Sequence, residues 1–305
     1  MIDIAVIGGG PAGLTAALYA ARAGKTVTVY ERECIGGQIT QALQVENYPG
    51  TGTVSGLQLG DSMAAQAEAA GSEISLTDVQ KITKETTGFF RLDTDDGKYY
   101  AKAVIYACGA RPRTLGIPGE AELIGHNVSY CALCDGNFYR GQNVAVIGGG
   151  SSAFNDALLL SEQCHHITLI HRRSIFRAEQ ALIDRAKLQN NISLLTDMTV
   201  SELIQENGKL SGLTLKRKDG KSESLSVSGL FVALGRIPDT ELLVDLTELD
   251  ENGYVFTNEQ MAVSGISGLF AAGDCRVKSV RQLTTAVSDG TIAAISACEY
   301  LEKQK

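Results

Sequence analysis

Apolar runs along the chain are separated by short glycine-rich breaks, and the first such run predicts a strand, a turn and a helix. Residues 2–7 are almost continuously apolar, as expected for a strand of a parallel sheet that is buried on both faces. Residues 14–23 are rich in alanine and leucine and favour a helix, and residues 26–30 form a second β-prone run. This order of elements is typical of a βαβ unit.

The turn between the first strand and the helix has the sequence of a nucleotide-binding loop. Gly8, Gly10 and Gly13 form a G-x-G-x-x-G motif, and the second strand ends at Glu31. Glycines allow the backbone to turn tightly and to approach a pyrophosphate, whose charge the helix N-terminus stabilises. The acid accepts hydrogen bonds from a ribose hydroxyl. The segment therefore predicts a dinucleotide site.

A second copy of this pattern lies in the middle of the chain. Residues 143–147 predict a strand, a glycine turn and a helix-prone stretch follow, and residues 167–170 predict the next strand. The turn places Gly148, Gly150 and Ala153 at the three motif positions, with Ser151 and Ser152 between them. One isolated glycine motif is weak evidence, but two in full βαβ context at a constant offset predict two dinucleotide sites.

The residues that end the two copies differ in charge. The first copy ends at Glu31 and Arg32, whereas the second ends in a basic cluster of His171, Arg172, Arg173 and Arg177. A carboxylate suits a free ribose 2′-hydroxyl and repels a phosphate, whereas guanidinium groups suit a 2′-phosphate. The first site is therefore predicted to bind a nucleotide such as FAD, and the second NADPH. A solvated basic surface is the alternative interpretation of the arginines.

Two extended, proline-containing segments, residues 111–118 and 235–241, flank the second copy and predict two chain crossings between domains. A late strand over residues 267–272 would complete the first sheet, and residues 282–301 would form the last helix. The expected fold class is α/β, with one domain inserted into the other. The predicted domains are a discontinuous FAD-binding domain, 1–113 with 244–305, and an NADPH-binding domain, 114–243.

Composition and charge narrow the class of protein. With 44% hydrophobic and 20% charged residues over 305 positions, the chain has a globular composition. Its net charge of −8 and the absence of a large basic face argue against a nucleic-acid partner. The uncharged run over residues 4–21 has the length of a membrane helix, but a Gly-Gly-Gly-Pro turn interrupts it, so no membrane contact is expected. Residues 1–3 carry no positive charge, so no secretory signal is expected, and a cytoplasmic location is predicted.

The seven cysteines include one pair with a distinctive spacing, Cys131-Ala132-Leu133-Cys134, followed directly by Asp135. Two thiols at this spacing can close a disulfide and reopen it, carrying two electrons, and Asp135 could transfer the proton that exchange requires. The sequence favours a redox-active dithiol in a reducing compartment, without a metal. A zinc site completed by Cys164-His165-His166, a structural disulfide, and helix capping by Asp135 are the alternatives. Buried free thiols are expected at Cys34, Cys108, Cys275 and Cys298, and a surface turn is expected at Cys164.

These motifs together resemble the low-molecular-weight (bacterial-type) thioredoxin reductases, which are FAD-dependent pyridine nucleotide-disulfide oxidoreductases. The resemblance covers essentially the whole chain and keeps the family's order of motifs. Further stretches that carry it are Gly36-Gly37-Gln38, Glu46-Asn47-Tyr48-Pro49-Gly50, residues 171–178, Gly273-Asp274-Cys275-Arg276 and Arg281-Gln282. Cys108 and Cys275 depart from the family pattern, in which Thr and Val are usual.

The resemblance implies two Rossmann-like domains, each with a three-layer ββα core, in a homodimer with FAD and NADPH as cofactors. Electrons would pass from NADPH through FAD and a Cys131–Cys134 disulfide to thioredoxin, with domain rotation between the half-reactions. Cys134, beside Asp135, would face the flavin, and Cys131 would attack the substrate. The implied FAD-binding residues are Gly8, Gly10, Pro11, Ala12, Gly13, Glu31, Arg32, Gly37, Gln38, Asn47, Gly273, Asp274, Arg281 and Gln282. The implied NADPH-binding residues are Gly148, Gly150, Ser151, Ser152, Ala153, His171, Arg172, Arg173 and Arg177.

Three other functions agree with parts of the sequence. A related dithiol oxidase would pass electrons from a small dithiol to oxygen without NADPH, and a ferredoxin-fed reductase would also have no use for the arginine cluster. A flavin-binding interaction protein without turnover would have no use for Cys131, Cys134 and Asp135. The sequence favours the NADPH-dependent reductase over all three.

Overall fold

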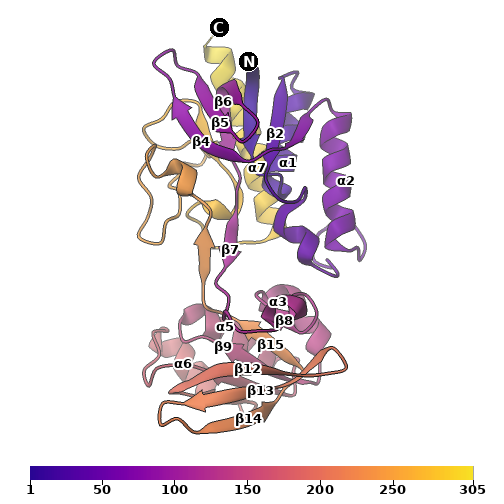
Figure 1. Ribbon diagram of the computed structural model, residues 1–305, viewed down its shortest axis with the longest axis vertical. Helices are drawn as coiled ribbons and strands as arrows, with labels where there is room; N and C mark the ends of the chain where they lie inside the picture. Colours follow the sequence, from indigo (N-terminus) through magenta and orange to yellow (C-terminus); the bar gives the residue numbers. More distant parts are fainter. Residues whose placement is uncertain (305) are drawn as a thin grey trace. The chain divides into compact units, whose positions relative to one another are not determined.

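The computed structural model describes residues 1–304 and divides into two compact units (Figure 1). Unit 1 combines both ends of the chain, Met1–Arg111 and Ile237–Lys305, and unit 2 is Pro112–Arg236. The second crossing lies earlier than the sequence-based boundary at residues 243 and 244. The reason is that the chain after the crossing already packs with unit 1, where Leu243 is fully buried in the core.

The sheet of unit 1 is built on the strands that the apolar runs predict. β1 (Ile2–Ile7) pairs in parallel with β2 (Val27–Glu31) on one side and with β6 (Lys98–Tyr106) on the other. The strand order is β3-β2-β1-β6-β5-β4, and the late strand β17 (Leu269–Ala271) also pairs with β6 in parallel. The remaining strands are β3 (Glu73–Leu76), β4 (Val79–Lys84) and β5 (Phe90–Thr94).

Helices with small residues on their buried faces cover this sheet. α1 (Pro11–Arg22) packs closely against α7 (Leu283–Lys303). The absence of a side chain at Gly290 permits this approach, since a Cβ atom there would overlap the carbonyl oxygen of Ala12. α1 begins before the predicted stretch 14–23, since Pro11 occupies the first helical position, where a missing N–H costs no helical hydrogen bond. The other helical segments of unit 1 are α2 (Gly56–Ala69) and the 3₁₀ turns η1 (Gly37–Gln41), η3 (Glu241–Leu243) and η4 (Gly273–Cys275).

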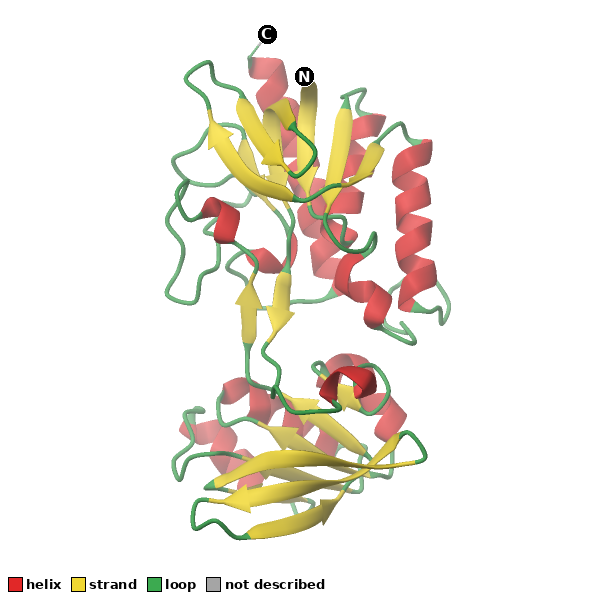
Figure 2. Ribbon diagram, in the orientation of Figure 1, coloured by secondary structure: helices red, strands yellow, loops and turns green. Residues whose placement is uncertain are grey.

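Unit 2 has three layers (Figure 2). A parallel sheet in the order β11-β10-β9-β15-β8 packs against helices on one face and against the antiparallel sheet β12-β13-β14 on the other. The strands are β8 (Val128–Ser129), β9 (Asn143–Ile147), β10 (His166–Ile170), β11 (Ile192–Leu195), β12 (Met198–Glu206), β13 (Lys209–Arg217), β14 (Ser222–Ser226) and β15 (Gly229–Val232). The helical segments are α3 (Glu120–Leu123), α4 (Ala132–Asp135), η2 (Gly136–Tyr139), α5 (Ser151–Ser161) and α6 (Gln180–Lys187). The predicted α/β fold class is confirmed.

A two-stranded sheet marks both chain crossings. β7 (Ala110–Pro112) pairs with β16 (Arg236–Pro238), and the Arg113 N–H donates a hydrogen bond of 2.9 Å to the carbonyl oxygen of Gly235. Proline favours an extended conformation in the residue before it, which agrees with strands at both prolines. The chain thus leaves unit 1 and returns to it along one paired ribbon.

Two cysteines differ from their predicted environments. Cys34 is exposed, so the prediction of a buried thiol is wrong there. Cys164 lies in the predicted turn before β10, where Glu162 and His165 are exposed, but its own side chain points into the core of unit 2 between α5 and β10 and is buried. Cys275 and Cys298 are buried as predicted, and Cys108 is half-buried. No helix within residues 1–304 is long and apolar enough to cross a bilayer.

Candidate active site

The first glycine turn is tightly packed on the side that faces the protein and open on the side of Gly10. Gly8 has a φ of +104°, and a Cβ atom there would lie 2.6 Å from the carbonyl oxygen of Ala107. A Cβ atom at Gly13 would overlap the carbonyl oxygen of Gly8, whereas one at Gly10 would meet no atom within 4 Å. The open space lies at the start of α1, where backbone N–H groups and the helix dipole favour an anion. The turn therefore has the shape and polarity that a dinucleotide pyrophosphate requires.

Glu31, at the end of β2, is held beside this turn by backbone hydrogen bonds. One carboxylate oxygen accepts the Gly9 N–H at 2.7 Å, and the other accepts the Glu33 N–H at 2.8 Å. A carboxylate offers about four acceptor positions, so further lone pairs are available to ribose hydroxyls. Arg32 points to a different partner, because its guanidinium forms an ion pair of 2.9 Å with Asp239, just after β16.

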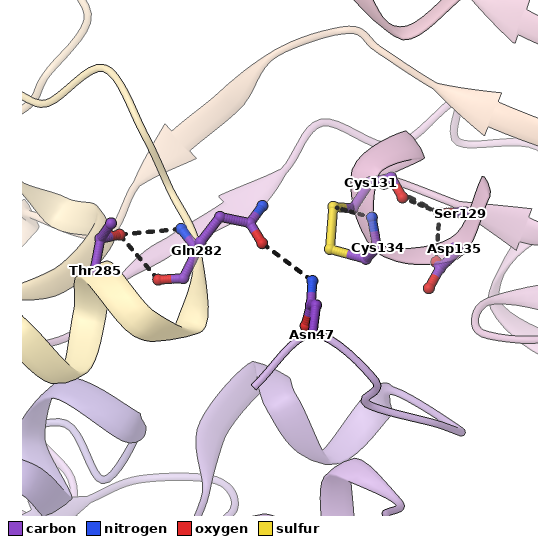
Figure 3. Close-up of a disulfide and its surroundings, with 7 residues drawn as sticks. All are labelled: Asn47, Ser129, Cys131, Cys134, Asp135, Gln282 and Thr285. Carbon is purple, nitrogen blue, oxygen red and sulfur yellow. Dashed lines mark hydrogen bonds between the residues drawn. A yellow bond between two sulfur atoms is a disulfide. The ribbon is translucent and has the colours of Figure 1, made fainter. Parts of the chain in front are cut away.

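Residues predicted to lie by the flavin come together within unit 1. The Asn47 side-chain amide donates to the Gln282 side-chain oxygen at 3.3 Å, which joins a loop before α2 to the start of α7 (Figure 3). The Gln38 amide donates to the carbonyl oxygen of Ala110 at 3.0 Å. Gly37 approaches the first glycine turn so closely that a Cβ atom there would lie 3.1 Å from the Cα atom of Gly10.

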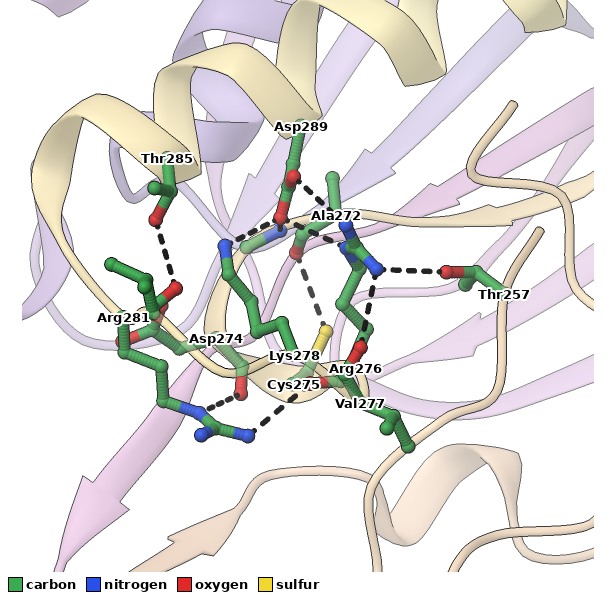
Figure 4. Close-up of polar contacts among 12 residues, drawn as sticks. Thr257, Ala272, Asp274, Cys275, Arg276, Val277, Lys278, Arg281, Thr285 and Asp289 are labelled. Carbon is green, nitrogen blue, oxygen red and sulfur yellow. Dashed lines mark hydrogen bonds and ion pairs between the residues drawn. The ribbon is translucent and has the colours of Figure 1, made fainter. Parts of the chain in front are cut away.

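The Gly273–Asp274 turn follows β17 and completes the same region. Gly273 has a φ of +82°, and a Cβ atom there would lie 3.0 Å from Cβ of Ala12 in α1. Arg281 donates through Nε to the carbonyl oxygen of Asp274 at 3.4 Å (Figure 4). Its guanidinium also lies over the ring of Tyr254. β1, β2 and β17 are parallel strands, so the predicted FAD residues that follow them gather at the carboxyl edge of one sheet, where α/β folds bind ligands.

The second glycine turn, in unit 2, repeats the geometry of the first, with Ala153 in place of the third glycine. A Cβ atom at Gly148 would lie 2.6 Å from Cβ of Ala153 and from the carbonyl oxygen of Ala233, and one at Gly150 would meet no atom within 4 Å. α5 begins directly afterwards at Ser151, whose hydroxyl accepts the N–H of Glu179 at 3.2 Å. The turn is again closed below and open at a helix N-terminus.

The basic cluster after β10 separates into one buried ring and three exposed cations. His171 is 6% exposed, lies under Gly149, contacts the carbonyl oxygen of Ile175 at 3.2 Å and stacks on Phe176. Burial lowers the pKa of His171, the hydrogen bond with Ile175 offsets part of this, and the neighbouring arginines lower the pKa further, so the neutral form of the ring is favoured. The positive charge of this segment is therefore carried by Arg172, Arg173 and Arg177. All three are exposed, and within residues 1–304 none has a carboxylate within 4 Å.

Asp156, in α5, is a half-buried carboxyl group whose charge should destabilise unit 2. Burial raises its pKa from 3.8 to about 6. The folded protein then binds this proton more tightly than the unfolded chain, so the contribution of Asp156 to stability is fully present below pH about 4 and is lost as the pH rises through about 6. We expect Asp156→Asn to raise the free energy of unfolding at pH 8 by up to about 3 kcal/mol, because one pKa unit corresponds to about 1.4 kcal/mol. The gain should vanish near pH 3.5.

Urea unfolding of the variant and the parent protein at these two pH values tests this expectation. Asp184→Asn is the matched control, since Asp184 is an exposed aspartate in α6. A gain for Asp156→Asn that is the same at both pH values would contradict the assignment to Asp156 ionisation.

Cys131 and Cys134 are joined as a disulfide around the short helix α4, with their Cα atoms 5.3 Å apart. Cys131 precedes the helix, and its sulfur accepts the N–H of Cys134 at 3.2 Å. Cys131 is half-buried, whereas Cys134 and the intervening Leu133 are exposed. The bond therefore lies at the surface of unit 2, within reach of an external reactant.

Asp135 is held in place by a residue that carries no motif signal. The Ser129 hydroxyl lies 2.6 Å from a carboxyl oxygen of Asp135, and the same hydroxyl accepts the N–H of Cys131 at 3.0 Å (Figure 3). Burial raises the pKa of Asp135, and the hydrogen bond from Ser129 offsets part of the rise. Asp135 makes no side-chain cap to the 3₁₀ turn that follows it, and its carboxyl group faces Ser129 instead.

A second residue outside the motifs, Glu120, ties the segment after the first crossing to the disulfide region. Its carboxylate is 4% exposed and accepts the N–H groups of Leu115 at 2.9 Å and Gly116 at 2.8 Å. The Tyr130 hydroxyl donates to it at 2.7 Å, directly before Cys131 in the sequence. These three donors satisfy the buried carboxylate, which has no cationic partner among residues 1–304.

Comparison with known proteins agrees with this site. The family model described as "Pyridine nucleotide-disulphide oxidoreductase" matches residues 2–290, and the chain belongs to that family. Thioredoxin reductase from Listeria monocytogenes is 38% identical over 99% of this chain and 95% of its own, and that from Treponema pallidum is 41% identical over 98% and 97%. The solved thioredoxin reductase of Streptococcus pyogenes is 40% identical, with a TM-score of 0.94 over 99% of both chains. The resemblance to low-molecular-weight thioredoxin reductases is confirmed, and with it the cofactors FAD and NADPH.

Proposed function

We propose that the protein is an NADPH-dependent reductase of the thioredoxin disulfide that uses FAD and the Cys131–Cys134 disulfide. The observation that carries the proposal is the place of this disulfide. It lies at the surface of the unit that also holds the second glycine turn and the exposed arginines, beside an acid with a raised pKa. A disulfide in that setting is suited to thiol exchange rather than to holding the fold together. The Listeria and Treponema relatives, named thioredoxin reductases, support this activity.

The cysteines of the chain carry out the thiol–disulfide exchange, and bound FAD and NADPH supply the hydride chemistry. In the dithiol form, the Cys131 thiolate attacks one sulfur of the thioredoxin disulfide, which breaks, and the leaving sulfur takes up a proton. The Cys134 thiolate then attacks Sγ of Cys131, which re-forms the Cys131–Cys134 bond and releases thioredoxin as a dithiol. Asp135 is assigned to hold the proton that moves to or from Sγ of Cys134. Two electrons and two protons pass to thioredoxin in each cycle.

The two units have different cofactors in this proposal. Unit 1 binds FAD through the first glycine turn, Glu31 and the Gly273–Asp274 turn, and unit 2 binds NADPH through the second glycine turn and the three exposed arginines. The open space above each turn and the opposite charges that follow β2 and β10 support the assignment. His171 supports its turn from below, and Arg32 contributes through its ion pair with Asp239.

Alternation between two arrangements follows from this division. The disulfide and the proposed NADPH residues belong to unit 2, whereas the proposed flavin residues belong to unit 1, so two partners must reach one flavin in turn. The connection is the ribbon of β7 and β16, in which each strand is only three residues long. Rotation about such a connection is a known way to order steps. Two solved thioredoxin reductases of similar identity to this chain, 40% and 38%, match with TM-scores of 0.94 and 0.68, and the second is titled an FR conformation. This spread supports more than one arrangement of the fold.

A homodimer and a cytoplasmic location are the remaining parts of the proposal. Both are carried by the family resemblance, and the use of a free thiol pair agrees with a reducing compartment.

An assay of NADPH oxidation at 340 nm, with and without oxidised thioredoxin, tests the function. We expect oxidation to depend on thioredoxin and NADH to replace NADPH poorly, because the exposed arginines select a 2′-phosphate. Oxygen consumption with a small dithiol and no NADPH would instead identify a dithiol oxidase. Bound flavin without any turnover would identify a flavin-binding protein, and either result would refute the proposal.

A further inference from the structure

A buried carboxylate on α7, outside all the sequence motifs, lies against the Gly273–Asp274 turn (Figure 4). Asp289 is 5% exposed and contacts two cations. Arg276 binds both of its oxygens, through Nε at 3.0 Å and Nη2 at 3.2 Å, and Nζ of Lys278 lies 2.7 Å from Oδ2. Both cationic side chains are largely buried, so the three charges form one desolvated cluster.

Asp289 also bonds the backbone of the turn itself. The Gly273 N–H donates to Oδ2 at 3.1 Å, and this residue has the left-handed φ of +82° that favours glycine. On the opposite side, Gly273 faces Ala12, at the start of α1. Gly290, next to Asp289, packs on the carbonyl oxygen of that same Ala12. The turn is therefore clamped between the first glycine loop and the Asp289 carboxylate.

Arg281 connects to the same turn through two backbone carbonyl groups. The carbonyl oxygen of Arg276 accepts a hydrogen bond from Nη2 of Arg281 at 3.3 Å, and Nε of Arg281 donates to the carbonyl oxygen of Asp274. Arg276 is also held from outside by the Thr257 hydroxyl at 3.2 Å. One carboxylate thus fixes a backbone segment that runs from Gly273 through Asp274 to Arg281.

Stability alone is a weak explanation for this cluster. Desolvating one anion and two cations costs free energy that their mutual attraction only partly repays, and apolar residues of similar volume often serve a core equally well. The best-attested use of such buried charge is to fix one geometry among several. Here the fixed geometry is that of a turn predicted to bind FAD, at the edge where the first glycine loop opens.

We propose that Asp289 is a positioning residue for FAD, which holds the Gly273–Asp274 turn and Arg281 in the geometry that receives the dinucleotide. The inference rests on FAD binding by unit 1 in the proposed function. Without the carboxylate, two buried cations lose their counter-charge and the Gly273 N–H loses its acceptor, so the turn would sample other geometries and FAD would bind more weakly. Asparagine keeps the shape and one acceptor oxygen but removes the charge, and alanine removes both.

The test is the dissociation constant of FAD for the full chain, measured by the recovery of flavin fluorescence as holoenzyme is diluted. We expect Asp289→Ala to raise this constant by about a hundredfold and Asp289→Asn by about tenfold, since hydrogen bonds to charged groups are the strong ones. Thr257→Val is the matched control: it removes an outer partner of Arg276 and should change the constant by less than about threefold.

The thermal unfolding of each FAD-free chain separates positioning from general stability. A positioning role predicts a larger loss in the FAD-bound unfolding temperature than in the FAD-free one. If Asp289→Ala does not fold, Asp289→Asn decides the question. A parental FAD dissociation constant in Asp289→Asn, or equal losses of unfolding temperature with and without FAD, would overturn the inference. Failure of the parent chain to bind FAD would instead refute the proposed function.

Discussion

Cys134→Ser is expected to stop thioredoxin reduction and to trap thioredoxin as a mixed disulfide. The remaining Cys131 thiolate still attacks, but no second thiol resolves the product. Turnover should fall by about a thousandfold or more, because the two thiols act as one unit. The measurement is a non-reducing gel after incubation with a thioredoxin whose own resolving cysteine is serine.

Cys131→Ser should fail differently. It is expected to lose turnover to the same extent and to trap little thioredoxin, since Cys134 is assigned to the flavin side. Cys134 is exposed, so its thiol is accessible to a reactant outside unit 2. Both variants should still accept hydride from NADPH. Trapping by Cys131→Ser and not by Cys134→Ser would reverse the assignment.

Cys34→Ser is the control for both variants. Cys34 is an exposed free thiol of unit 1, so its replacement alone and in the Cys134→Ser background tests whether this cysteine contributes to turnover or to trapping. We expect parental turnover from Cys34→Ser alone and undiminished trapping from the double variant. Parental turnover in either Cys131→Ser or Cys134→Ser would refute the dithiol mechanism itself.

Replacing Arg172 and Arg173 together by alanine is expected to raise the KM for NADPH by about a hundredfold or more and to leave that for NADH nearly unchanged. Each charge-assisted hydrogen bond to a phosphate contributes about 1.5–3 kcal/mol, and neither guanidinium has an acidic partner to lose within residues 1–304. Initial rates with both nucleotides check this result.

Arg185→Ala provides the matched control, because Arg185 is an exposed arginine of unit 2 that lies in α6, outside the turn. It should change neither KM. An equal loss with NADPH and NADH in the double variant would reject the assignment of a 2′-phosphate to this turn.

The sequence predicts the elements whose signals are local. The glycine turns follow their strands directly, and their spacing alone indicates both βαβ units. The C-x-x-C pair is equally local, since three residues bring its Cα atoms within reach of a disulfide. The fold class and the cysteine chemistry could therefore be predicted from the order and spacing of residues.

Residues whose partners are set by the packing of one element on another could not be predicted. Asp289 meets Gly273 only because α7 crosses the start of α1, and Glu120 meets Tyr130 only because α3 packs beside β8. His171 occupies the register position of Glu31 and contacts Gly149 as Glu31 contacts Gly9, but its ring is buried against Phe176 and presents no carboxylate to a ribose. Register gives the position of a residue on a strand, and packing decides which way its side chain points.

The pairing of β7 with β16 makes unit 2 a removable insert. Since the chain leaves unit 1 beside the point where it returns, a tight turn of a few residues could close the gap without disturbing the sheet of unit 1. Such closeness of the two ends is what allows a whole domain to enter a surface loop during evolution. Glu120 sets a limit on how the insert is excised, because a separate unit 2 must begin early enough to keep Leu115 and Gly116 on its carboxylate. The ribbon of β7 and β16 therefore also marks the place in unit 1 where a gene segment that encodes unit 2 could have been inserted.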